Sequence, residues 1–243
     1  MNGVTSPWRQ FRRRYFKPWW RVPYGEVKVH YKRHLDGGGN AQGQEYLPFL
    51  VDRGAPRFER VFEWCAGPGF IGFSLLAHGF CKTLCLADVN KEAVLACRRT
   101  VRYNRLDDRV TVYHSDNLKA IPASEQWDLV VSNPPHFPVD RITDIRLHDP
   151  SFQLHRDFFN DVGKFLKPDG VIVLQENNLG STAATFKDMI EAAGLSIIFA
   201  QGDGGKLTPY PRYYYLGIVH RGAKVPPWAT ATPSPYSALA ASA

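Results

Sequence analysis

The chain has 243 residues, of which 44% are hydrophobic and 22% charged, a balance that suits one α/β domain with attached segments. It has no run of about 18 apolar residues, which argues against a membrane-spanning helix. Its basic N-terminus is not followed by an apolar stretch, which argues against a secretory signal. The formal net charge is +7. We therefore expect a cytoplasmic protein without membrane association.

Residues 1–34 form an N-terminal arm that is both basic and rich in aromatic residues. Such a segment can bind phosphates and stack on bases, which would suit a nucleic-acid partner. Alternatively, the aromatic side chains pack the arm onto the main domain while the arginines stay solvated, and this is the interpretation we favour. Within the arm, the segment 25–33 alternates apolar and polar residues, which predicts a strand, as in a hairpin.

The rest of the chain, residues 35–221, alternates predicted strands and helices. A glycine-rich loop leads into a helix over about 44–51. The predicted strands that follow lie at 60–66, 82–89, 110–116, 127–132, 171–176, 195–202 and 212–220. The predicted helices between them lie at 67–79, 90–106, 152–166 and 181–193, and the third of them is stopped by the Lys-Pro-Asp-Gly run at 167–170.

This alternation predicts a doubly wound, mostly parallel sheet of seven strands with helices on both faces. The link between the last two strands is too short for a helical crossover, so we expect the last strand to be antiparallel. Residues 222–243 are rich in Pro, Ala, Ser and Thr, which predicts a disordered tail. The cysteines Cys65, Cys81, Cys85 and Cys97 show no metal-ligand spacing, so we expect buried reduced thiols and no metal.

A glycine-rich turn follows the first strand of the predicted sheet. Gly67, Gly69 and Gly72 spell G-x-G-x-x-G, and Asp88 follows about 20 residues later at the end of the next strand. This pattern fits a nicotinamide dinucleotide as well as S-adenosylmethionine. Glu63, four residues before the first glycine, favours the second. A carboxylate there is unfavourable beside a pyrophosphate but suits a cofactor that is cationic at sulfur and amine.

Four segments resemble motifs I to IV of class I S-adenosylmethionine-dependent methyltransferases: VFEWCAGPGFIG, LADVN, HSDN and VVSNPPHF. More narrowly, they are similar to the N-methyltransferases that carry Asn-Pro-Pro and an aromatic residue. That group includes HemK-type release-factor glutamine methyltransferases, small-domain ribosomal RNA guanine-N2 enzymes and adenine-N6 enzymes. The resemblance covers roughly residues 40–220 and implies methyl transfer to a planar nitrogen of a nucleic acid or a protein.

The resemblance also implies the cofactor contacts. Gly67 and Gly69 would line the amino-acid end of S-adenosylmethionine, with Glu63 near its ammonium group. Asp88 would bind the ribose and Asp116 the exocyclic amine of adenine. Further contacts are implied for Cys65, Ala66, Gly72, Val89, Asn90, Asn117, Asn133 and, more weakly, Gln44 with Gly43.

The Asn-Pro-Pro corner indicates nitrogen chemistry. Pro134 and Pro135 fix φ and remove two backbone donors, leaving a stiff turn whose carbonyl oxygens can accept hydrogen bonds. The Asn133 side-chain oxygen and the Pro134 carbonyl could each accept one hydrogen of a planar NH₂ group. That would aim the nitrogen lone pair at the donated methyl group, and positioning of this kind can contribute roughly 7–11 kcal/mol.

The sequence departs from the common pattern after the two prolines. His136 stands where Tyr or Phe is usual, and Phe137 follows. His136 could stack on the acceptor, hydrogen-bond it, accept a proton or have no chemical role. An acceptor pocket could be lined by five other residues: His155, Arg156, Tyr210, Arg212 and Tyr213. Each could equally have a structural role in the core or lie at the surface.

The acceptor itself stays open. A macromolecular substrate is the first hypothesis, and a small metabolite, with the arm as a lid, is the second. A binding subunit that has lost catalysis and a nicotinamide oxidoreductase are the further alternatives.

Overall fold

The structure is a computed structural model that describes residues 18–36, 39–139, 144, 146–202 and 213–231. Its centre is a seven-stranded sheet in the order β5-β4-β3-β6-β7-β9-β8, and a separate hairpin pairs β1 with β2. The strands are β1 (Trp19–Tyr24), β2 (Val27–Lys32), β3 (Phe58–Glu63), β4 (Cys81–Asp88), β5 (Val110–His114), β6 (Trp127–Ser132), β7 (Leu166–Asn177), β8 (Leu195–Gly202) and β9 (Tyr213–His220). The helices are η1 (Arg33–Leu35), α2 (Gly39–Asp52), α3 (Phe70–Ala77), α4 (Lys91–Asn104), η2 (Pro150–Phe152), α5 (Gln153–Val162), α6 (Ala183–Ala192) and α7 (Pro227–Thr230).

The predicted doubly wound sheet is confirmed. Strands β5, β4, β3, β6 and β7 pair in parallel, and β9 runs antiparallel to both β7 and β8. The chain winds outward from β3 to β5 in one direction and from β6 in the other. The winding therefore reverses between β3 and β6, and ligands of such sheets bind outside the carboxyl ends of the strands at that point.

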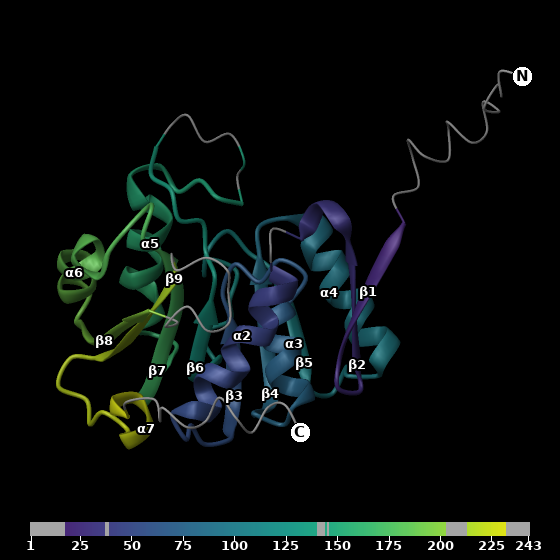
Figure 1. The fold of residues 1–243 in the computed structure, drawn as a ribbon, viewed down its shortest axis with the longest axis horizontal. Helices are drawn as coiled ribbons and strands as arrows, with labels where there is room; N and C mark the ends of the chain where they lie inside the picture. The colour runs from purple at the N-terminus through teal and green to yellow at the C-terminus, as the bar shows by residue number, and fades with distance from the viewer. Residues whose placement is uncertain (1–17, 37–38, 140–143, 145, 203–212, 232–243) are drawn as a thin grey trace, which may run out of the picture.

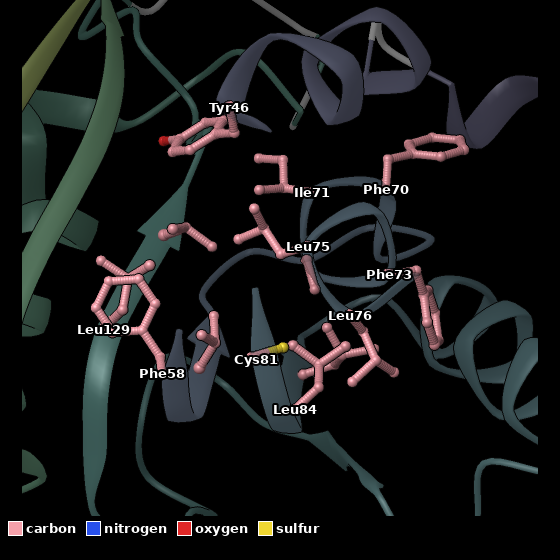
Figure 2. Close-up of a cluster of buried hydrophobic side chains, with 14 of the residues drawn as sticks. Tyr46, Phe58, Phe70, Ile71, Phe73, Leu75, Leu76, Cys81, Leu84 and Leu129 are labelled. Carbon is pink, nitrogen blue, oxygen red and sulfur yellow. The ribbon is translucent and has the colours of Figure 1, made fainter. Parts of the chain in front are cut away.

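Helices cover both faces of the sheet (Figure 1). Alternate strand residues divide between two cores, as the two-residue period of a strand requires. Val61 of β3 and Leu129 of β6 belong to the core under α2 and α3, whereas Phe62 and Val130 belong to the core under α5 and α6. Figure 2 shows the first core, where Ile71 and other apolar side chains of α3 lie over the strands.

The N-terminal hairpin packs on the domain instead of standing apart from it. Its alternate residues, including Val22 and Val29, are buried in the same core as α3 and α4. Strand β2 lies along α4, where the backbone N–H of His30 donates to Thr100 Oγ1 at 2.9 Å (Figure 1). The predicted hairpin is thus present and packs on the domain. The side chains that pack are residues such as Val22 and Val29, whereas Trp19 and Trp20, which we expected to do so, are 36% and 45% exposed. Residues 1–17 lie outside the described residues.

The C-terminal segment differs from the expectation of a disordered tail. Residues 227–230 form α7, and Trp228 is only 6% exposed because its ring packs edge-on against Phe58 at 5.7 Å. Pro227 is the first residue of the helix, a position that proline favours, and the buried indole holds the turn on the domain. The packed domain therefore extends at least to residue 231, and residues 232–243 lie outside the described part.

The Lys-Pro-Asp-Gly run, predicted to stop a helix, lies inside a strand. Helix α5 ends at Val162, and β7 begins at Leu166. The pairing with β6 shifts register between Trp127 and Leu129, so the run bulges out of the ladder, where Pro168 is tolerated. At Gly170 a Cβ would lie 2.9 Å from the carbonyl oxygen of Trp127, which explains the glycine.

Candidate functional site

The loop between β3 and α3 turns sharply at the carboxyl edge of the sheet. Gly67 and Gly69 have φ angles of 52° and 82°, a left-handed conformation that glycine adopts without steric cost. The Gly69 N–H donates to the Ala66 carbonyl at 2.7 Å, and the Ala66 N–H donates to Ala87 of β4 at 3.0 Å. Cys65 is also left-handed, at 51°, and burial raises the pKa of its thiol well above the ordinary value. The loop is therefore closely bonded to two strands.

Glu63, at the end of β3, is buried beneath the first turn of α3. Its carboxylate accepts the N–H of Gly72 at 2.7 Å and that of Ile71 at 3.3 Å, so it caps the helix. Burial raises the pKa of Glu63 to about 8; the two backbone N–H groups oppose that shift, and the nearby Asp88 adds to it. A cationic ligand at this position would favour the ionised form.

Gly72, predicted as a cofactor contact, has a packing role. A Cβ at this position would lie 2.7 Å from Glu63 Oε2 and 2.7 Å from Leu84 Cδ1. The glycine therefore lets α3 approach β3 and β4 closely, which is the usual role of the third glycine in this pattern. The sequence pattern located the residue, but Gly72 faces the sheet and not the ligand edge.

Asp88, at the end of β4, closes the glycine loop from the other side. Its Oδ2 accepts the N–H of Gly67 at 2.7 Å, and its Oδ1 accepts the N–H of Asn90 at 2.7 Å. Burial raises the pKa of Asp88, against these backbone bonds. Val89 next to it is 53% exposed, an apolar surface at the sheet edge, while the Asn90 side chain caps α4 by accepting the Glu92 N–H at 2.9 Å.

The residues after β5 present one exposed and one buried side chain. Asp116 is exposed and pairs with Lys119 at 2.5 Å. Asn117 is left-handed and buried, and its amide donates to the Leu154 carbonyl at 3.0 Å. Its Oδ1 has no hydrogen-bond partner among the described residues. The two predicted contacts thus lie at the carboxyl edge, with Asn117 also joining this loop to α5.

The Asn-Pro-Pro corner follows β6, the strand beside β3, and so stands next to the glycine loop. The two strands stay joined up to the corner, because Trp64 N–H donates to Val131 at 3.0 Å and Ser132 Oγ donates to the Trp64 carbonyl at 2.6 Å. From α2, the Tyr46 hydroxyl donates to the Ser132 carbonyl at 2.5 Å. The structure therefore brings Asn133 to the same edge as Gly67 and Asp88.

A chain of hydrogen bonds fixes which way the Asn133 amide points. Gln175 of β7 donates from Nε2 to the Glu45 carboxylate at 2.9 Å, and a carboxylate can only accept. The Gln175 carbonyl oxygen must then face Asn133, and it accepts from Asn133 Nδ2. Asn133 consequently directs its Nδ2 inward and keeps Oδ1 for another donor. Neither Glu45 nor Gln175 was singled out from the sequence.

His136 belongs to a second buried chain on the other face of β7. Its Nδ1 lies 3.5 Å from Glu176 Oε2, and Glu176 Oε1 lies 3.0 Å from His155 Nε2. His155 Nδ1 in turn lies 2.6 Å from Asp149 Oδ2. All four side chains are nearly or fully buried. His155, an open candidate in the sequence, is thus placed, whereas Asp149 and Glu176 were missed; polar residues at the end of an apolar strand were the available signal for Glu176.

Backbone contacts hold the segment after the prolines. The N–H groups of His136 and Phe137 both donate to the Leu147 carbonyl, at 3.1 and 2.8 Å. Gly180 packs against the carbonyl of His136, where a Cβ would lie 2.1 Å from the oxygen. Pro134 is buried and Pro135 half-buried. The corner is therefore a rigid part of the fold.

Other candidates fall outside this arrangement. Gln44 lies in α2, but its side chain is outside the described part, as are Tyr210 and Arg212. Arg156 is exposed on α5. Within the described ranges no group of three or more His, Cys, Asp or Glu side chains is arranged so that it could hold a metal ion. In the same ranges no helix is long and apolar enough to cross a membrane.

Exposed basic and aromatic side chains lie on both sides of the hairpin, on η1 and on α4, and we call this surface the hairpin face. Arg99 lies over the Trp19 ring at 4.8 Å, and Arg33 lies over the Trp20 ring at 5.7 Å. It also includes the exposed residues Arg21, Lys28, Arg98, Arg102, Tyr103 and Arg105. The loop that carries the proline corner touches its edge, because Arg146 Nη1 donates to the His34 carbonyl at 2.8 Å.

Comparisons with known proteins agree with this geometry. The family model described as "Methyltransferase small domain" matches residues 43–195. A release factor glutamine methyltransferase of Clostridium acetobutylicum is 27% identical over 165 residues, covering 62% of this chain and 57% of that protein. The 4-amino-L-phenylalanine/4-methylamino-L-phenylalanine methyltransferase of Streptomyces pristinaespiralis is 29% identical over 156 residues, covering 58% and 52%. The chain thus spans less than two thirds of either relative.

Among solved structures, a 16S rRNA N2 methyltransferase of T. Thermophilus, determined with AdoMet and guanosine, shares the fold. It superposes with a TM-score of 0.54 at 17% identity, covering 84% of this chain and 50% of that one.

Proposed function

The chain belongs to the methyltransferase small domain family, and from this premise we propose that it transfers a methyl group from S-adenosylmethionine to a planar nitrogen. The observation that carries the proposal is the orientation of Asn133. Its amide nitrogen is bound by Gln175, so Oδ1 is the atom left to meet an acceptor, one strand away from the glycine loop. An outward carbonyl oxygen suits an incoming N–H.

The chemistry of the acceptor follows from two oxygens. Asn133 Oδ1 and the Pro134 carbonyl each take one hydrogen of an NH₂ group whose lone pair is otherwise delocalised. This orients the nitrogen for an in-line displacement and stabilises the positive charge that develops on it. The rigid corner loses little entropy in doing so, since the prolines fix its backbone.

S-adenosylmethionine would supply an electrophilic methyl group on a sulfonium ion, and the residues at the edge fit it. The left-handed Gly67 and Gly69 let a ligand approach the backbone. Asp88 would accept the ribose hydroxyls, and the exposed face of Val89 suits an adenine ring. Asp116 would bind its amine, and the Glu63 carboxylate lies behind the loop as a partner for positive charge.

The acceptor is a macromolecule in the version we favour. The three compared proteins are named for a release factor glutamine, an amino-acid amine and a ribosomal RNA base. All three acceptors are nitrogens. The hairpin face adds positive charge and aromatic rings that suit a nucleic acid, since phosphates and bases need both. A cytoplasmic location stays a prediction.

A small-molecule acceptor is the second candidate, and the Streptomyces relative is the observation that favours it. In that case the hairpin face would have no part in catalysis. A binding subunit without turnover is the third reading, and it predicts cofactor affinity alone.

The experiment separates these readings. Titration calorimetry of the full chain with S-adenosylmethionine tests cofactor binding, which Asp88→Ala should abolish. Radiolabelled methyl transfer is then measured to three probes: a glutamine-containing peptide, a mixed-sequence oligoribonucleotide and 4-amino-L-phenylalanine. Asn133→Ala should lose turnover by about 10²–10³-fold with cofactor affinity retained, while Asn160→Ala, an exposed asparagine on α5, should behave as the parent. Absence of cofactor binding would overturn the proposal.

A further inference from the structure

Four ionisable side chains form a buried row behind the proline corner: His136, Glu176, His155 and Asp149. They come from the corner itself, the end of β7, α5 and the turn before α5, so the fold brings together segments distant in sequence. The distances along the row are 3.5, 3.0 and 2.6 Å. Burying this many ionisable groups is costly unless they neutralise one another.

The charges of the row follow from its hydrogen bonds. Both nitrogens of His155 face carboxylates, and a carboxylate accepts only, so both nitrogens carry hydrogen and the ring is an imidazolium. Burial opposes this state, but Glu176 and Asp149 outweigh it and raise the pKa of His155 to about 9. Burial alone would raise the pKa of Glu176, but His155 and His136 outweigh burial and lower that pKa overall.

One negative charge is then left over. Glu176 and Asp149 contribute two, His155 compensates one, and His136 is the remaining described side chain with a ring nitrogen facing Glu176. The other ionisable neighbours influenced by Glu176 are Tyr214, Cys65 and Tyr46, and burial raises the pKa of each, so they stay neutral. A proton on His136 would bring the row to neutrality.

The His136 ring is buried and held by its neighbours, so it cannot easily stack on an acceptor. It is 3% exposed, with Tyr213 at 5.9 Å and Phe137 at 6.1 Å, both edge-on. Its backbone N–H is bonded and its carbonyl packs against Gly180. Nδ1 faces the Glu176 carboxylate, which can only accept, so Nδ1 carries the hydrogen of the neutral ring and Nε2 is the nitrogen with the lone pair.

We propose that His136 is the base that removes the proton from the methylated nitrogen, and that Glu176, His155 and Asp149 are positioning residues that compensate its charge. This rests on the proposed function. The acceptor nitrogen forms its bond to the methyl carbon as the carbon–sulfur bond breaks with its electrons to sulfur. The nitrogen, now positively charged, releases the hydrogen that the Pro134 carbonyl had accepted, which moves as a proton to His136 Nε2, and Glu176 stabilises the resulting imidazolium. An acid–base group, His136, thus takes the position after Asn-Pro-Pro that an aromatic stacking residue usually holds.

The test compares His136→Tyr, His136→Phe and Glu176→Gln, with His78→Gln at the opposite edge of the sheet as the matched control. Each is assayed across pH with whichever of the three probes the parent protein methylates. Both His136 variants should lose about 10²–10⁴-fold in kcat and the acidic limb of the pH profile, with cofactor affinity unchanged. Glu176→Gln should shift that limb to lower pH, whereas a merely structural role would lower stability and leave the limb in place.

A second measurement does not depend on turnover. In ¹⁵N-histidine NMR of the full chain bound to S-adenosylhomocysteine, His155 should remain an imidazolium at neutral pH while His136 titrates, and Glu176→Gln should lower the His136 midpoint. Full activity of His136→Tyr with an unchanged profile would overturn the proposal, because it would restore a stacking role. If instead the parent protein binds cofactor but methylates none of the probes, an unaltered His136 midpoint in Glu176→Gln refutes the row by itself.

Discussion

The orientation of the Asn133 amide depends on a carboxylate that never touches the acceptor, and this can be tested by one isosteric change. In Glu45→Gln, position 45 can present either an NH₂ or an oxygen to Gln175. The Gln175 amide can then turn over, and the Asn133 amide with it. Shape and volume are almost unchanged, so the change acts on hydrogen-bond polarity.

The magnitude follows from one hydrogen bond. A net bond of about 0.5–1.5 kcal/mol holds the productive orientation, and about 1.4 kcal/mol corresponds to tenfold. Releasing the preference leaves the two amide orientations about equally populated, so kcat should fall by about twofold at most. Removing the oxygen altogether, in Asn133→Ala, should cost about 10²–10³-fold. Gln175→Met, which removes both links, should lie between the two.

The assay is single-turnover methyl transfer with saturating cofactor, combined with calorimetry for cofactor affinity. In the Asn133→Ala background neither Glu45→Gln nor Gln175→Met should cause a further loss, because both act through Asn133. An equal loss in both backgrounds would show that Gln175 and Glu45 act independently of the amide, and the reasoning would be refuted.

Three further predictions concern the packing of the fold and the charge of Glu63. Gly72→Ala should destabilise the protein by about 1–3 kcal/mol in urea unfolding because its Cβ meets Glu63 and Leu84. Gly163→Ala, whose Cβ would make only an ordinary contact with His220 Cε1 at 3.6 Å, should change little, and equal effects would remove the packing argument. Trp228→Ala should lower the free energy of unfolding by about 3–5 kcal/mol. An unchanged urea midpoint would mean that α7 is not part of the core. Burial raises the pKa of Glu63 from its ordinary value of 4.5 to about 8. The stability that this group contributes is therefore fully present below pH 4.5 and is lost as the pH rises through 8. Cofactor binding at pH 7 should then release protons, seen as a dependence of the calorimetric enthalpy on the buffer; no such dependence would contradict it.

The periodic parts of the fold could be predicted from the sequence. Strand β8 matches its expected range of 195–202, and the last strand is antiparallel, since a ten-residue link leaves no room for a crossover. The tail could not be predicted because its composition is that of a disordered segment, and one indole, Trp228, decides its packing. The run at 167–170 does not end a helix as predicted, because a bulge allows these helix-stopping residues to lie within a strand.

The candidate site could be predicted only where chemistry follows a motif. Gly67, Asp88 and Asn133 were located by their places after three strands, and the structure gathers them at one edge. Glu45 could not be found, because its partner Gln175 is 130 residues away in sequence. Asp149 lies only six residues before His155, but the sequence does not show that the turn before α5 directs its carboxylate at that ring.

The adjacency of Gln175 and Glu176 has a consequence for how this sequence can vary. Neighbouring side chains on a strand point to opposite faces, so inserting a single residue just before them would exchange the two: the amide would be buried with the histidines and the carboxylate beside Asn133. At the start of β7 the pairing with β6 is irregular: Trp127 pairs with Leu166, and Leu129 pairs with Val171. A change in length within this bulge would leave unchanged which side chains of residues 172–176 face each side of the sheet. Insertions should therefore be tolerated at 167–170 and be lethal to activity between 172 and 174.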